Sequence, residues 1–212
     1  MLKTKSDGFS LMEVLISMIV IAVGLLGYLS LQLSSINSNQ EGMARSQATL
    51  IAQDLASSLR SNRSYIFNGD STEAEGAKGN AYLSSGTTNY NSCSANPAKT
   101  CANGVSCTDK EQAQFDVWMI CRTVTGFDTA TTTSDLLNDG RVFVGCDDRD
   151  TTDADTCSPG STLTIYAYWL ANANREDTGQ KSEIIRNSRC DSANFASDPG
   201  ANYDCIVMDI MP

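Results

Sequence analysis

The hydrophobic pattern of the first sixty residues changes once, near residue 33. From Val14 to Leu33 the chain has twenty residues without a charge. As a helix this run is about 30 Å long, enough to cross the hydrocarbon core of a membrane. After it, apolar residues recur at spacings of three and four, which is typical of an amphipathic helix with one face to bury. They are Ala44, Ala48, Ile51, Ala52, Leu55 and Leu59.

No proline lies between residues 9 and 62. A helix interior tolerates proline poorly, so its absence lets both patterns belong to one element. We therefore predict one continuous helix of about fifty residues, roughly 80 Å long. Its first half is apolar all round and its second half is apolar on one side.

The pattern beyond residue 63 predicts a polar segment, a second helix and a sheet. Ser64 to Lys110 has few apolar residues, and so long a loop needs a function or a covalent staple. A helix is predicted over Gln112–Val124, with Ala113, Val117, Ile120/Cys121 and Val124 on one face. Strands are predicted at 141–145, 162–170, 182–186 and 205–211. The amphipathic stripe then covers one face of an antiparallel sheet, which gives an α+β fold.

Composition excludes several classes of function. The net charge of −10 disfavours direct binding of nucleic acid, which needs clustered Lys and Arg. The absence of histidine removes Ser-His-Asp and Cys-His catalysis and nearly all catalytic zinc sites. No carboxylate pair or activated Ser–Lys arrangement stands out either. We therefore expect no enzyme activity and no cofactor.

The cysteines indicate an oxidising compartment. There are eight, and none forms a C-x-x-C pair, so the spacing fits neither a zinc ribbon nor a thioredoxin-type site. They are Cys93, Cys101, Cys107, Cys121, Cys146, Cys157, Cys190 and Cys205. An even number in an Asn- and Ser-rich region argues for disulfides, with scattered buried thiols as the alternative.

The segment 146–157, "CDDRDTTDADTC", holds five aspartates between two cysteines. A calcium loop is one interpretation, with alternating oxygen ligands from Asp148, Asp150, Asp153 and Asp155. The segment lacks the glycine and the closing glutamate of an EF-hand loop. We therefore favour a solvated acidic hairpin closed by Cys146 and Cys157.

Glu13 is the only charged residue between Asp7 and Glu41. An ionisable group in a membrane-length segment is costly, so Glu13 is a candidate functional residue by default. Lys3 and Lys5 precede the apolar run and predict that the N-terminus stays cytoplasmic while the rest is exported. A secretory signal peptide has a shorter apolar stretch followed by an A-x-A-like site, so this segment does not fit one.

The stretch "GFSLMEVL", from Gly8 to Leu15, resembles the processing site of type IV pilins and pseudopilins. The resemblance implies that a prepilin peptidase cuts after Gly8 and that the new amine of Phe9 is methylated. It also implies that Glu13 neutralises the N-terminal amine of a neighbouring subunit as the subunit docks. A buried charge is tolerable when it is paired in this way.

Within the superfamily, "LMEVLISMIVIAVGLLGYLSLQ" looks most like the minor pilins called PilV. Residues 115–124 and 162–172 are similar to later stretches of that family. Ser30 stands where many major pilins carry a helix-kinking proline, which fits a low-abundance subunit. The resemblance implies a minor pilin that primes filament assembly, forms a tip complex and supports adhesion, twitching motility or DNA uptake. The alternative is a minor pseudopilin of a type II secretion system.

The same resemblance implies a division of the chain. Residues 1–8 are a leader, 9–33 the transmembrane and assembly half of the helix, 34–63 its amphipathic half and 64–212 an exported globular head. The implied partners are other minor pilins, the major pilin, the prepilin peptidase, the inner-membrane assembly platform and a tip adhesin. The implied location is a single-pass inner-membrane protein with a periplasmic head, and then the pilus tip or cell surface.

The resemblance also implies one disulfide. In pilins a C-terminal disulfide closes an outward-facing loop, and here Cys190 and Cys205 enclose fourteen loop-forming residues with a Pro199-Gly200 turn. We therefore predict a bond between Cys190 and Cys205. The other six cysteines allow 15 pairings. Of these we predict only Cys146–Cys157.

Overall fold

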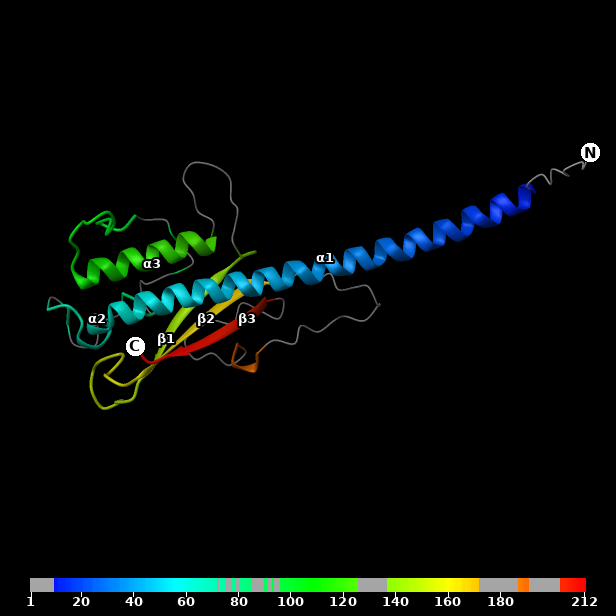
Figure 1. Cartoon of the computed structure of the whole chain (residues 1–212). Coiled ribbons are helices and arrows are strands. Elements are labelled where there is room, and N and C mark those ends of the chain that lie inside the picture. Colours follow the sequence, from blue (N-terminus) through cyan, green and yellow to red (C-terminus); the bar gives the residue numbers. More distant parts are fainter. Residues whose placement is uncertain are drawn as a thin grey trace, which may run out of the picture.

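A computed structural model describes residues 10–71, 73–74, 78, 81–84, 90, 93, 96–125, 137–171, 187–190 and 203–212. Its elements, in chain order, are α1 (Leu11–Ser61), α2 (Arg63–Asn68), α3 (Asp109–Thr125), β1 (Arg141–Asp147), β2 (Thr162–Leu170), the 3₁₀ turn η2 (Ser188–Cys190) and β3 (Tyr203–Ile210). A long helix lies against an antiparallel sheet (Figure 1), so the α+β prediction is confirmed. We call the Glu41–Ser61 part of α1, together with the described residues that follow it, the head.

Helix α1 runs without interruption for 51 residues, which confirms the prediction of a continuous helix. It begins after Ser10, whose extended backbone places its carbonyl to accept hydrogen bonds from the N–H groups of Glu13 and Val14. It ends where Asn62 leaves helical geometry while its N–H still bonds to the carbonyl of Ser58. The two hydrophobic patterns of the sequence therefore belong to one rigid rod.

The second half of α1 is the centre of the core. All members of the predicted stripe are buried except Ala44, which is partly buried and packs against the core. Helix α1 contacts α3 on one side and β2 and β3 on the other (Figure 1). The small alanine side chains let the helix axis approach the sheet closely, while Leu55 and Leu59 fill the space between.

The sheet has the order β1-β2-β3, with both pairs antiparallel. The predicted strand at 162–170 is confirmed as β2, and its side chains alternate, since Leu163, Ile165, Ala167 and Trp169 belong to the core cluster under α1. The opposite face forms a second buried cluster of Tyr166, Tyr168, Cys190, Tyr203 and Cys205. The predicted strand at 182–186 lies outside the described residues.

Helix α3 starts three residues before its predicted boundary of Gln112. The reason is a reciprocal cap: Glu111 N–H donates to Thr108 Oγ1, and Thr108 N–H donates to Glu111 Oε2, at 3.2 and 2.8 Å. This is the capping box of the sequence pattern T-x-x-E. The predicted buried face of the helix is confirmed at all its positions.

The prediction of a polar segment from Ser64 to Lys110 is wrong in part. The segment contains most of helix α2, and six of its described side chains belong to the main core cluster: Tyr65, Ile66, Phe67, Tyr82, Leu83 and Tyr90. Half of them are tyrosines, whose hydroxyls find acceptors inside the protein. Tyr82 donates to Asp116 and Tyr90 donates to the carbonyl of Tyr82, both at 2.6 Å. These side chains follow no helical or strand period, so the pattern did not identify them.

Candidate functional site

The first half of α1 projects away from the head (Figure 1). Its large apolar side chains from Leu11 to Ile36 are 44% to 82% exposed. An apolar surface of this extent marks a membrane or an interaction with other proteins. By length and composition the helix can cross a membrane. Within the part of the chain that the structure describes, this half of α1 is therefore open to contacts with lipid or other molecules.

Two glycines in this half face open space in the described structure. A Cβ atom added at Gly24 or Gly27 would meet nothing within 4 Å. Neither residue is needed for packing or for an unusual backbone conformation in this chain. Small residues in an apolar helix allow another helix to approach closely, which fits an intermolecular surface.

Glu13 lies in the first turn of α1 and is exposed. A carboxylate is favourable there because the N-terminal N–H groups of a helix carry partial positive charge. Its carboxylate forms no ion pair with any residue that the structure describes. Gly8 and Phe9, the other two predicted site residues, lie outside the described residues. The described part of the chain therefore provides the helix N-terminus but no cationic partner for this charge.

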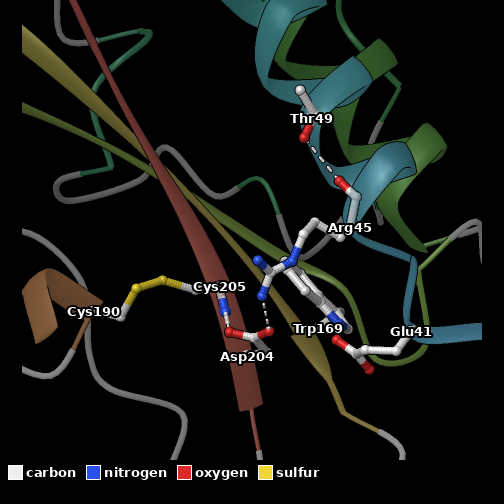
Figure 2. Close-up of polar contacts among 7 residues, drawn as sticks. All are labelled: Glu41, Arg45, Thr49, Trp169, Cys190, Asp204 and Cys205. Carbon is white, nitrogen blue, oxygen red and sulfur yellow. Dashed lines mark hydrogen bonds and ion pairs between the residues drawn. A yellow bond between two sulfur atoms is a disulfide. The ribbon is translucent and has the colours of Figure 1, made fainter. Parts of the chain in front are cut away.

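Two polar contacts, shown in Figure 2, join α1 to the sheet at Glu41 and Arg45. The indole N–H of Trp169 donates to Glu41 Oε1 at 3.0 Å, and Arg45 Nη2 donates to Asp204 Oδ2 at 2.7 Å. We call this pair of interactions the neck contacts, and the part of α1 from Glu41 to Thr49 the neck. Asp204 is 3% exposed, so its charge needs the guanidinium. Sequence analysis missed both contacts because Glu41 and Arg45 have the spacing of an ordinary surface pair on one helix.

All eight cysteines are described, and none is free. Cys190 is bonded to Cys205 and Cys146 to Cys157, which are the two expected pairs. The other bonds join Cys93 to Cys121 and Cys101 to Cys107. The Cα–Cα distances are 5.7 to 6.4 Å, within the usual range for disulfides. The Cys93–Cys121 bond ties the segment before α3 to the helix itself.

The aspartates of the 146–157 loop turn toward the loop itself. Asp148 Oδ1 accepts from the N–H groups of Asp150 and Ser158 and from the hydroxyl of Ser161. Partial burial acts to raise the pKa of Asp148, but these hydrogen bonds outweigh it, and the pKa is lowered. Asp150 and Asp153 likewise accept backbone N–H groups two residues further on. Within the described residues, no group of three or more acidic, Cys or His side chains is placed to hold a metal ion.

A buried polar network joins the end of α1 to α3. The side-chain amide of Asn62 donates to Tyr82 Oη and to the carbonyl of Asp109. Tyr82 in turn donates to Asp116. Burial raises the pKa of Tyr82 well above its ordinary value, and burial also raises the pKa of Asp116. The network fixes the corner after α1, and sequence analysis did not identify it.

Comparisons with known proteins cover the first 118 residues almost completely. Residues 3–29 match the family model of the prokaryotic N-terminal methylation motif, and residues 30–118 match the model of the Tt1218-like family, described as type IV pilin Tt1218. No curated protein and no solved structure matches the chain. The first match spans Gly8, Phe9 and Glu13. The second spans the neck, the second half of α1 and most of α3.

Proposed function

The chain is a type IV pilin-like protein, and on that premise we propose that it is a minor pilin of a type IV pilus. In this role it assembles with other minor pilins, primes polymerisation of the major pilin and forms part of the tip complex. Adhesion, twitching motility and DNA uptake then depend on it indirectly. The role is structural and involves no catalysis by this chain.

The observation that carries the proposal is the division of α1. The large apolar side chains described in its first half are exposed and do not belong to the core of the head. The side chains on one face of its second half lie in the centre of that core. Such a helix is stable in two places, a lipid bilayer and a bundle of similar helices. Moving from the first to the second is what filament assembly requires of a subunit. Glu13 stands at the start of that surface, where a charge needs a partner in either place.

Three features support a minor subunit in place of the main one. Helix α1 contains no proline, so it lacks the kink of many major pilins. We take its length of 212 residues to fit a minor subunit as well. Four disulfides bond its eight cysteines. A PilV-type subunit is the form of this proposal that the anchor sequence favours.

The experiment that tests the proposal is replacement of Glu13 in cells. Glu13→Gln keeps the size of the side chain and the apolar anchor but removes the charge. We expect the variant to reach the membrane, to be processed and to be missing from sheared filaments. Glu13→Asp is the matched control, since it keeps the charge and is expected to retain most incorporation. Wild-type incorporation of Glu13→Gln would contradict the docking role.

Processing provides a separate test of the leader. The proposal places the cut between Gly8 and Phe9, so Gly8→Leu should leave full-length protein in the membrane. N-terminal sequencing of the mature wild-type protein measures the site directly. A mature N-terminus at any other residue contradicts the predicted processing.

Deletion of the gene distinguishes the pilus from the alternative filament. A minor pilin predicts loss of surface pili with normal secretion of folded enzymes. A minor pseudopilin of a type II secretion system predicts the reverse. The comparison uses electron microscopy of the cell surface and enzyme activity in the culture medium of the same strain.

A further inference from the structure

Two successive residues at the start of β3 point to opposite faces of the sheet. Side chains alternate along a strand, so Asp204 faces α1 and Cys205 faces the other side. On one face Asp204 accepts from Arg45, and on the other Cys205 is bonded to Cys190 of η2 (Figure 2). This short piece of strand therefore meets both the long helix and the C-terminal disulfide.

On the helix side, the seating of α1 depends on side-chain contacts. The described side chains of α1 from Leu11 to Gln40 are exposed. The helix around the start of the head includes several poor helix formers, namely Ser34, Ser35, Ser38, Asn39 and Gly42. The neck contacts lie at the end of this weak stretch. Arg45 and Asp204 are 159 residues apart in sequence, so local propensity does not bring them together.

On the disulfide side, both cysteines are buried, and backbone groups of each form hydrogen bonds. Cys190 is 0% exposed and Cys205 is 4% exposed. The hydroxyl of Tyr168 donates to the carbonyl of Cys190 at 3.1 Å. The N–H of Cys205 donates to Asp204 Oδ1 at 2.8 Å, so the residue that carries the disulfide also orients the carboxylate. Each oxygen of Asp204 thus has one partner, and the two partners belong to different parts of the fold.

We propose that Asp204 is a positioning residue through which the Cys190–Cys205 bond holds the neck of α1. The bond fixes the start of β3, a terminal strand of the described sheet, which would fray without it. Fraying moves Asp204 away from Arg45 and leaves a buried carboxylate without its cation. The neck contacts then weaken together, and α1 loosens between Glu41 and Thr49. In this way a disulfide near the C-terminus controls how firmly α1 is held against the sheet at the point where it emerges from the head.

Hydrogen exchange followed by mass spectrometry on the full chain in detergent micelles tests the proposal. In Cys190→Ser/Cys205→Ser, amides from Glu41 to Thr49 should exchange about tenfold faster than in wild type. Asp204→Asn should have a similar effect at the neck while its disulfide still forms. The matched control is Cys101→Ser/Cys107→Ser, which removes a disulfide from another loop. Its neck should exchange as in wild type.

Combining the variants separates the proposed route from a general loss of stability. If the disulfide acts through Asp204, the triple variant should exchange at the neck no faster than the faster of its two parents. Additive effects overturn the proposal, and so does an unchanged neck in Cys190→Ser/Cys205→Ser. Equal acceleration in α3, which packs on α1 and β1, also overturns it. Arg45→Lys keeps the cation and should stay close to wild type. If a cysteine variant folds poorly, an unchanged neck in Asp204→Asn still overturns the proposal. No outcome depends on the role in a pilus.

Discussion

Leu25 and Leu55 are the same residue type in the same helix, and their surroundings differ completely. Leu25 is 57% exposed on the first half of α1, whereas Leu55 is 0% exposed between α3 and the sheet. Helical periodicity is continuous from one to the other, and no kink separates them. The change occurs at the neck contacts, where Glu41 and Arg45 first meet the sheet.

The comparison shows that one helix has two separate sets of constraints. Residues after Glu41 contribute to the stability of the head, because their side chains are removed from water within the chain. The described side chains of α1 before it are exposed, and an apolar surface of this kind is stabilised by lipid or by other helices. Substitutions in the first half should therefore affect membrane insertion and assembly, and those in the second half should affect folding.

Paired truncations give the largest expected effect. Leu55→Ala should lower the free energy of unfolding of the head by about 4 kcal/mol, because it leaves a cavity in a fully buried site. Leu25→Ala removes the same atoms from an exposed site and should leave the unfolding of the head unchanged. Denaturant unfolding in detergent, followed by the near-UV signal of the tryptophans, measures both. A lower free energy of unfolding of the head in Leu25→Ala would contradict the separation of the two halves of α1.

The disulfides of the head give the next largest effect. In the chain-entropy model, Cys93→Ser/Cys121→Ser should cost about 3.5 kcal/mol, since the bond closes a long loop. Cys101→Ser/Cys107→Ser should cost less, about 2 kcal/mol, because its loop is short. Neither pair should change the helicity of the first half of α1. Thermal unfolding measures the stability of the two variants, and an inverted order would show that native contacts outweigh loop entropy.

Regular elements of the fold were predictable because their patterns are periodic. The stripe from Ala44 to Leu59 repeats at helical spacing, and β2 alternates in a period of two. The burial of Tyr82 and Tyr90 was not predictable, because they lie in irregular chain and are held by hydrogen bonds to particular partners. The start of α3 could have been found from Thr108 and Glu111, which form a capping box in the sequence.

For the candidate site, the local parts were predictable and the long-range parts were not. The anchor and the position of Glu13 follow from a contiguous stretch of sequence. The partner of Arg45 does not, because Asp204 is one of many acidic residues and only the packing of β3 selects it. The pairing of Cys93 with Cys121 has the same origin, since it depends on where α3 lies.

The smallest expected effect is a difference in how stability depends on pH between a buried carboxyl of the head and an exposed one. Asp116 accepts from Tyr82 and Gln112 on α3, next to the buried half of α1. Burial is the largest cause that raises its pKa, and Asp54 of α1 adds to it, while the two hydrogen bonds oppose it. A carboxyl whose pKa is raised on folding stabilises the head fully below its unfolded pKa, and this contribution is lost as pH rises through the folded pKa.

The melting temperature of wild type relative to Asp116→Asn should therefore fall between about pH 3 and about pH 7. Asp150→Asn is the matched control of opposite sign, because hydrogen bonds from Thr152 lower the pKa of Asp150 in the exposed loop. A group of that kind stabilises the head above its unfolded pKa and loses its contribution as pH falls through the folded pKa. The melting temperature of wild type relative to Asp150→Asn should thus increase as pH rises. If both differences in melting temperature change in the same direction with pH, burial does not govern the titration of Asp116. The interior beside α1 would then not differ from the exposed loop in its pH dependence.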